Sequence, residues 1–216
     1  MTSILKIENL TKKVKGVTLL DSINLTIDES GVYGIIGRNG SGKSIFFKTL
    51  SGLLRPTQGS ITLFDINIHQ GNLPRDFGAL LDIPGFLPQY SGFQNLKFLA
   101  SIQNKIEVEE IKSVMNFVGL NPESNIPVRK YSLGMKQRLG IAQAIMEHPK
   151  FLILDEPMNG LDESGVEDVR NMIKALKEKG VTVLIASHNS EDIRLLCDKV
   201  YKMDNGKLSL YEELNH

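Results

Sequence analysis

Apolar residues fall into short runs in the N-terminal part of the chain, and polar or turn-forming residues separate these runs. In residues 19–27, Ile23, Leu25 and Ile27 alternate with polar side chains, which is typical of a half-buried β-strand. Shorter apolar runs of strand length lie on either side of this segment. We therefore predict strands at residues 5–7, 19–27, 32–36, 60–64 and 79–81.

The second half of the chain shows helical periodicity, with apolar residues recurring every three or four positions. Between residue 93 and about residue 120 the pattern includes Phe98, Ile102, Ile111 and Val114. Residues 121–128 then lack it. We predict helical structure over residues 93–120, 134–147, 162–179 and 190–196.

Four further strands are predicted in the C-terminal half. Residues 151–154 and 181–186 are almost entirely apolar, which is the pattern of parallel strands buried on both faces. Asn205-Gly206 between residues 200–203 and 207–211 is a strong hairpin signal. The mostly helical residues 93–133 interrupt the strand-rich segments. This order predicts one domain, residues 1–216, with residues 93–133 as an inserted helical subdomain.

Composition excludes several classes of protein. The 216 residues are 41% hydrophobic and 23% charged, as in a soluble globular domain with one buried core. Lys plus Arg equals Asp plus Glu at 25 each, so we expect no nucleic-acid partner. The single cysteine, Cys197, cannot form an internal disulfide and fits a reducing cytoplasm. Residues 1–10 do not resemble a signal peptide, and no apolar run approaches the ~20 residues that span a bilayer. A membrane role would therefore require a partner.

A glycine-rich stretch follows the predicted strand at residues 32–36 and opens a helical pattern. Residues 37–44 fit G-x-x-x-x-G-K-[ST], the phosphate-binding loop. Its glycines permit a tight turn whose N–H groups point inward, and the helix N-terminus adds positive charge. Lys43 can reach the β- and γ-phosphates, and Ser44 can ligate Mg²⁺. The motif predicts a nucleoside triphosphate site formed by Gly37, Arg38, Asn39, Gly40, Ser41, Gly42, Lys43, Ser44 and Ile45.

Two later strands end in polar residues that suit the same chemistry. Asp155 and Glu156 follow the apolar residues 151–154, so they lie at the sheet edge where ligands bind. Asp155 would hold Mg²⁺ through water, and Glu156 would polarise a water for attack on the γ-phosphate. His188 follows the strand expected beside this one. It is either an ordinary surface histidine or a contact to the γ-phosphate.

Ser132 and Gly134 open the helix predicted at residues 134–147. A serine followed closely by glycine at this position is first of all a helix cap. The same geometry also forms an anion site at a helix N-terminus. The residues alone leave both interpretations open.

Taken in order, these motifs resemble the ATP-binding subunit of an ABC transporter, over nearly the whole chain. The resemblance implies an α/β fold of the P-loop NTPase type, a mixed sheet with N-terminal antiparallel strands and an inserted helical subdomain. Residues 132–138 and the loop at residues 81–86 resemble the branch associated with bacitracin and lantibiotic export or self-immunity. The motifs are residues 37–44, residues 132–138, Asp155-Glu156-Pro157, Asn159-Gly160-Leu161-Asp162, and His188.

The resemblance implies a two-chain ATPase mechanism. Two subunits dimerise head to tail, so that Ser132, Gly134 and Met135 of one chain cover the ATP on the other chain's loop. Glu156 is then the catalytic carboxylate, His188 the switch histidine, and Asp162 the link between the two sites. ATP closes the dimer, hydrolysis reopens it, and the helical subdomain passes the motion to separate permease subunits. The chain would thus be a cytoplasmic subunit, peripheral on the inner face of the membrane, in a homodimer or heterodimer.

Three positions depart from the family pattern. Residues 131–135 replace Leu-Ser-Gly-Gly-Gln and keep only the Ser and the second Gly, which puts the strength of the contact between chains in doubt. Val14 stands where the family places an aromatic that stacks on adenine, so we expect weaker, less base-selective binding. For the family's glutamine loop we favour Asp82, taking residues 77–81 as the preceding strand. Asp82 would offer an oxygen to Mg²⁺. Gln89 in Leu87-Pro88-Gln89 is the alternative, and otherwise faces a partner.

Two other roles compete with a transport motor. A soluble ABC-type ATPase acting on ribosomes or DNA usually carries two cassettes or a long coiled coil, and this chain shows neither. A non-hydrolysing regulator would not need Lys43, Glu156 and His188 together. The sequence therefore favours an ATP- and Mg²⁺-dependent motor that exports a peptide antibiotic or another small or lipophilic compound.

Overall fold

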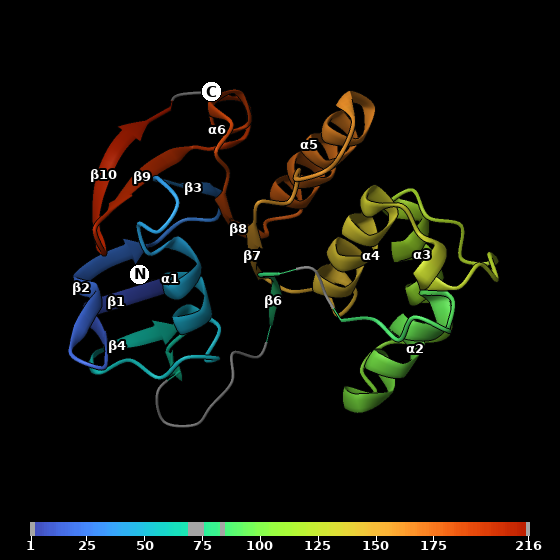
Figure 1. Ribbon diagram of the computed structural model, residues 1–216, viewed down its shortest axis with the longest axis horizontal. Helices are drawn as coiled ribbons and strands as arrows, with labels where there is room; N and C mark the ends of the chain where they lie inside the picture. Colours follow the sequence, from blue (N-terminus) through green and yellow to red (C-terminus); the bar gives the residue numbers. More distant parts are fainter. Residues whose placement is uncertain (1–2, 69–75, 83–84, 215–216) are drawn as a thin grey trace.

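The computed structural model describes residues 3–68, 76–82 and 85–214, and two β-sheets form its framework (Figure 1). A four-stranded sheet has the order β2-β1-β4-β5, and a six-stranded sheet has the order β10-β9-β3-β8-β7-β6. The first sheet is built only from N-terminal strands, whereas the second collects strands from the whole chain. This arrangement confirms the predicted α/β class with a mixed sheet and N-terminal antiparallel strands.

The N-terminal sheet is antiparallel throughout the described residues. β1 (Leu5–Val14) pairs with β2 (Val17–Ile27) and β4 (Gln58–Leu63), and β4 also pairs with the two-residue β5 (Ile66–Asn67). β1 extends well beyond the predicted residues 5–7. The register shifts between Ile7 and Lys13 break the alternation of buried and exposed residues, so the pattern hides the second half of the strand.

The larger sheet has a parallel centre. β3 (Val32–Ile36), β8 (Thr182–Ala186), β7 (Phe151–Asp155) and β6 (Phe77–Leu80) pair in parallel in this order. β9 (Lys199–Asp204) lies parallel to β3 on the other side. β10 (Lys207–Glu213) forms the predicted hairpin with β9 and is antiparallel to it. The central strands are apolar because both faces of the sheet are covered.

Successive residues of the central strands enter two separate hydrophobic clusters. On β7, Phe151 and Ile153 pack with α1 (Lys43–Leu50) and the N-terminal sheet. Leu152 and Leu154 pack on the opposite face with α5 (Glu163–Glu178) and α6 (Ser190–Leu196). The sheet therefore separates α1, which follows the glycine-rich loop, from the two C-terminal helices. The glycine-rich loop leaves the carboxyl end of β3 and leads into α1.

The helical segment contains α2 (Gly92–Gln103), α3 (Val108–Phe117) and α4 (Leu133–Ile145), with a single 3-10 turn at Val128–Lys130. The helical pattern of residues 93–120 thus belongs to two helices. Asn104 ends α2 in a left-handed conformation, and Glu107 and Glu110 form a capping box that opens α3. These helices lie together at the right of Figure 1, away from the N-terminal sheet. Residues 83–84 of the predicted loop lie outside the described residues.

Candidate nucleotide site

The glycine-rich loop connects β3 to α1, as its sequence predicts. Gly40 and Gly42 have φ of 80° and 114°, in the left-handed region that favours glycine. At Gly37, a Cβ atom would lie 2.4 Å from the carbonyl oxygen of Met203. Glycine is therefore needed for its backbone conformation at Gly40 and Gly42, and because β9 lies so close at Gly37.

Two side chains of the loop are placed to receive an anion. Lys43 is only 8% exposed, and its Nζ donates hydrogen bonds to the carbonyl oxygens of Gly37 (2.7 Å) and Arg38 (3.4 Å). The Ser41 Oγ is buried and is the one such side-chain atom without a hydrogen-bond partner among the residues that the structure describes. A buried hydroxyl without a partner is costly unless a ligand satisfies it. This loop therefore fits a phosphate group.

The carboxylate of Asp155, at the end of β7, meets the first turn of α1. Ser44 Oγ donates a hydrogen bond of 2.9 Å to Asp155 Oδ2. Burial raises the pKa of the Asp155 carboxyl; Ser44 and Lys43 lower it, whereas Glu156 and Asp82 raise it further. A divalent cation would offset these repulsions and favour the ionised form. A hydroxyl and a carboxylate are hard oxygen donors that Mg²⁺ accepts beside phosphate oxygens, so the pair fits this ion.

Glu156 and His188 also come together, from neighbouring strands. β7 and β8 are adjacent as predicted, and the Glu156 N–H donates to the Ala186 carbonyl at 3.0 Å. Glu156 Oε2 lies 2.7 Å from His188 Nδ1 and accepts a hydrogen bond from the His188 N–H at 3.3 Å. Glu156 has a φ of 52°, a conformation that costs a non-glycine residue about 1–3 kcal/mol. The turn after β7 thus holds this carboxylate in a strained, defined position.

A cavity of about 810 Å³ is lined by Lys43, Asp155 and Glu156 together. The glycine loop and the carboxylates line one part of it, and the start of β2 and the β9–β10 turn line another. Its volume, and a mixed lining in which a few charged and polar groups lie among apolar ones, suit a ligand the size of a nucleotide. The predicted site residues on its wall are Asn39, Gly40, Gly42, Lys43, Ser44, Ile45, Asp82, Asp155 and Glu156.

Comparison with known proteins shows which family the chain belongs to. Residues 20–159, more than half of the sequence, match the family described as ABC transporter. The chain belongs to this family. It is an ATP-binding subunit and an ATPase of the ABC type. Such subunits work as dimers with membrane permease subunits.

Three ABC relatives are similar over almost the entire chain. An uncharacterised ABC transporter ATP-binding protein, YybJ of Bacillus subtilis (strain 168), is 42% identical over 98% of this chain and 97% of its own length. The bacitracin transport ATP-binding protein BcrA of Enterococcus faecalis is 38% identical, over 100% of this chain and 70% of BcrA. The lantibiotic transport ATP-binding protein SrtF of Streptococcus pyogenes is 38% identical, over 97% of this chain and 91% of SrtF.

Solved ABC structures share the fold. The dimeric bacterial ABC transporter cassette MJ0796 matches with a TM-score of 0.88 at 23% identity, over 98% of this chain and 99% of that chain. The cbiO1 subunit of Clostridium perfringens matches with a TM-score of 0.80 at 28% identity, over 97% and 88% of the two chains. These matches confirm the predicted P-loop NTPase fold.

Several expected residues of an ABC site do not line the cavity. Gly37, Arg38 and Ser41 belong to the loop but are not among the residues that line the cavity, and His188 contacts the site through Glu156. Val14 lies at the tip of the β1–β2 hairpin, 44% exposed and paired with Val17. Ser132, Gly134, Met135 and Asp162 also lie outside it.

Ser132 acts as a helix cap within its own chain. Ser132 is exposed, and its Oγ accepts a hydrogen bond of 3.1 Å from the Met135 N–H at the start of α4. Asp162 caps α5 in the same way, through the Gly165 N–H at 2.9 Å. That bond and one from the Ser164 hydroxyl hold the pKa of the Asp162 carboxyl below its ordinary value. The Ser132 hydroxyl and the Asp162 carboxylate are therefore both held in place at the surface by helix-capping hydrogen bonds.

Asp82 and Gln89, the two candidates for the glutamine-loop position, are in different environments. Asp82 lines the cavity, and its Oδ2 lies 2.9 Å from Nζ of Lys48 on α1. Gln89 is exposed and does not line the cavity. This placement favours Asp82, although its carboxylate contacts Lys48 rather than Ser44 or Asp155.

For two residues beside the site, the sequence did not indicate their place in the fold. Gln137 of α4 is 5% exposed, and its Nε2 donates to the carbonyl oxygens of Glu156 (3.3 Å) and Pro157 (2.9 Å), so it connects the start of α4 to the turn after β7. Gly206 donates its N–H to the Ser41 carbonyl at 2.9 Å. The Asn205-Gly206 turn was recognisable as a hairpin, but its position against the loop follows from the pairing of β9 with β3.

Proposed function

We propose that this chain is the motor of an ABC exporter for a peptide antibiotic or another small or lipophilic compound. The observation that carries the motor role is the single cavity that brings Lys43, Asp155 and Glu156 together. The transport names of BcrA and SrtF support the direction and the cargo class.

Each group has a distinct role in hydrolysis. Lys43 leaves the loop carbonyls to bind the β- and γ-phosphates, while Ser41 and the backbone N–H groups bind the phosphate oxygens. Ser44 and Asp155 would hold Mg²⁺, which would supply positive charge against the triphosphate. Glu156 accepts the proton of the attacking water. His188 orients Glu156 and turns to the γ-phosphate when ATP is bound.

The cavity is half of a functional site. Ser132, Gly134 and Met135 lie at the N-terminus of α4 and do not line their own chain's cavity, although Leu133 between them does. A second subunit, identical or related, places these groups over ATP in a head-to-tail dimer. Asp162, ordered as the α5 cap, then connects the two sites.

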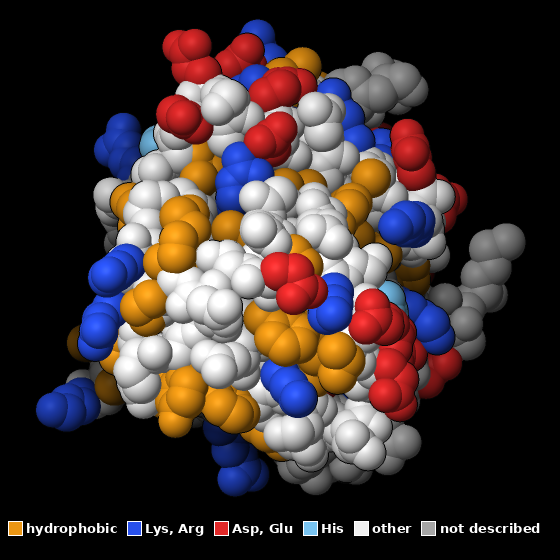
Figure 2. All heavy atoms as spheres, turned by 90° about the vertical axis from the view of Figure 1, so that its right-hand side faces the viewer, with side chains coloured by type: hydrophobic (Ala, Val, Ile, Leu, Met, Phe, Trp, Pro, Cys, Tyr) orange, Lys and Arg blue, Asp and Glu red, His pale blue; other side chains and the backbone are white. Residues whose placement is uncertain are grey.

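The helical region, residues 93–133, is the part that contacts the permease. No helix in the part of the chain that the structure describes is long and apolar enough to cross a membrane. The face in Figure 2 carries hydrophobic side chains in several groups among charged ones. Exposed apolar residues in and near α2 are Leu87, Phe98 and Ile102. We place the subunit in the cytoplasm, bound to the inner face of the membrane through this region, without a nucleic-acid partner.

The cargo is tested in a sensitive host. Co-expression of the chain with its permease subunit should raise the inhibitory concentration of bacitracin or of a lantibiotic. The same pair carrying Glu156→Gln should not protect. Protection against neither class of peptide, with both subunits present in the membrane fraction, contradicts the proposed cargo but leaves the ATPase role intact.

Restoring an aromatic at the hairpin tip should strengthen ATP binding. Stacking of a base on an aromatic ring stabilises binding by about 1–3 kcal/mol, so Val14→Tyr should increase ATP affinity about 5- to 150-fold. Affinities for ATP and GTP are measured by calorimetry, with Leu210→Tyr on β10 as a control at another exposed apolar position. Unchanged affinities for both nucleotides would count against Val14 as the adenine-side position.

The glutamine-loop assignment is tested by two alanine variants. If Asp82 contributes to Mg²⁺ binding, Asp82→Ala should raise the Mg²⁺ concentration needed for half-maximal ATPase about 10-fold, as expected for an outer-shell partner. Gln89→Ala should stay within two-fold of the wild type. Lys48→Met controls for loss of the Lys48–Asp82 ion pair. If Gln89→Ala abolished the Mg²⁺-dependent activity and Asp82→Ala did not, the assignment would be wrong.

A further inference from the structure

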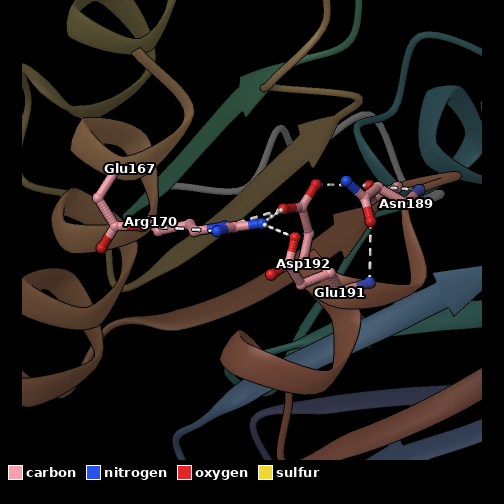
Figure 3. A network of polar contacts seen from close by, with 6 residues as sticks. Glu167, Arg170, Asn189, Glu191 and Asp192 are labelled. Carbon is pink, nitrogen blue, oxygen red and sulfur yellow. Dashed lines mark hydrogen bonds and ion pairs between the residues drawn. The ribbon is translucent and has the colours of Figure 1, made fainter. Parts of the chain in front are cut away.

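A network of polar side chains joins α5 and α6 (Figure 3). Arg170 of α5 donates to Asp192 Oδ1 of α6 from both Nε (3.0 Å) and Nη2 (2.7 Å). Nη2 also donates to Glu191 Oε2 at 3.0 Å. The Arg170 side chain is 11% exposed and that of Asp192 only 2%. This ion pair is therefore a buried connection between two helices, unlike an ordinary surface salt bridge.

The network continues to the residues on either side of His188. The Ser187 hydroxyl donates to Asp192 Oδ2 at 3.2 Å and accepts a hydrogen bond from the Asn189 N–H at 3.1 Å. Asn189 in turn caps α6 by accepting from the Glu191 N–H at 2.8 Å. The backbone before and after His188 is thus fixed through one hydroxyl to a buried carboxylate.

The imidazole of His188 is held by few contacts. It is 68% exposed, and the contact that holds it is the one to Glu156 Oε2. The direction of the imidazole therefore depends on the conformation of residues 187–189. Asp192 can hold that conformation only while its charge is compensated, because a buried carboxylate without a partner is strongly destabilising. Arg170 supplies the compensation.

We propose that Arg170 and Asp192 are positioning residues for ATP hydrolysis, which hold His188 in register with Glu156 through the Ser187 hydroxyl. The inference rests on the role proposed above for His188. Arg170 does not line the nucleotide cavity, and acts on turnover through the 187–189 turn. The chemistry predicts a loss in kcat without a loss in nucleotide affinity, because the contacts of the network join residues 170, 187, 189, 191 and 192 and do not involve the loop at residues 37–44.

Arg170→Met keeps an apolar stem of similar reach and removes the charge. In the full-length protein, it should lower kcat about 10- to 100-fold, as expected when a catalytic group is displaced by ~1 Å. The Kd for ATP should stay within two-fold of the wild type. Arg170→Lys, which keeps the charge, should restore part of the rate. Ser187→Ala removes only the connecting hydroxyl and should lower kcat in the same direction, so it provides the test if Arg170→Met does not fold.

The matched control is Lys177→Met. Lys177 also lies on α5 and forms an ion pair with Asp198, just after α6, but that pair does not lead to His188. Its kcat should be that of the wild type. Equal losses in both Met variants, parallel losses of kcat and ATP affinity, or an unchanged kcat in both Arg170→Met and Ser187→Ala would overturn the proposal.

His188→Ala separates failure of this inference from failure of the proposed site. If His188→Ala hydrolyses ATP like the wild type, the role proposed for His188 fails, and the inference fails with it. If His188→Ala is inactive while Arg170→Met and Ser187→Ala are not, only the positioning role fails. The His188 ring signals in a ¹⁵N NMR spectrum give a second readout, and they should shift in Arg170→Met but not in Lys177→Met.

Discussion

Replacing Glu156 with Gln should lower the rate of ATP hydrolysis about 10²- to 10⁴-fold, the contribution typical of a general base. Glutamine keeps the size of the side chain and can still contact the Nδ1 of His188, which now lies 2.7 Å from Glu156 Oε2. It cannot accept a proton from water. ATP affinity should change by less than two-fold, because the phosphate loop is untouched.

The variant should accumulate as an ATP-bound dimer, since hydrolysis is the step that reopens it. Phosphate release, ATP binding by calorimetry and size-exclusion chromatography with ATP measure the three consequences separately. Glu178→Gln, an exposed position at the end of α5, is the control for loss of one carboxylate. Phosphate release near the wild-type rate would sink the general-base assignment.

The parts of the site that the sequence predicts are those whose chemistry is local. The loop of residues 37–44 carries its own turn geometry and its own lysine, and it forms the predicted connection between strand and helix. Asp155 follows an apolar strand and therefore lies at the sheet edge. His188 required one assumption, that β8 lies beside β7, and the pairing of these strands confirms it.

The pattern of apolar and polar residues did not predict contacts between segments that are distant in the sequence. Arg170 and Asp192 lie 22 residues apart on two helices whose approach is set by packing against the sheet. Arg170 reads in the sequence as an ordinary exposed helical charge. Gln137 was seen as part of a motif, but its burial beneath the turn of Glu156 was not. The second half of β1 was missed because its irregular register removes the alternation that identifies a strand.

Lys43 is expected to bind ATP within its own chain, whereas Ser132 is expected to bind ATP on a second chain. The sequence of a single chain could therefore support only the role of Lys43 from its residues. Lys43 points into a cavity of its own chain. Ser132 caps a helix in its own chain, and any contact with ATP requires another. A residue whose partner lies on a second molecule leaves no trace in the packing of the first.

Lys43→Ala should therefore abolish function at the binding step. In the structure, Nζ is held 2.7 Å from the Gly37 carbonyl, so the charge stays at the loop until it turns to the phosphates of ATP. Truncating one member of a buried, hydrogen-bonded charge pair costs about 2–5 kcal/mol, which corresponds to a loss of about 30- to 5,000-fold in ATP affinity. Lys174→Ala, on the exposed side of α5, is the charge-matched control, and Lys43→Arg should retain part of the affinity.

Mixing variants extends this prediction to the dimer. Lys43→Ala and Ser132→Arg should each be inactive alone, because every site in either homodimer lacks one component. In a head-to-tail dimer of the two, the intact Lys43 of one chain faces the intact Ser132 of the other, so one complete site is restored. ATPase activity should then recover on mixing. Recovery cannot arise if both residues serve the same chain, because each variant then carries its own defect into any dimer; an inactive mixture that still forms mixed dimers contradicts the head-to-tail site.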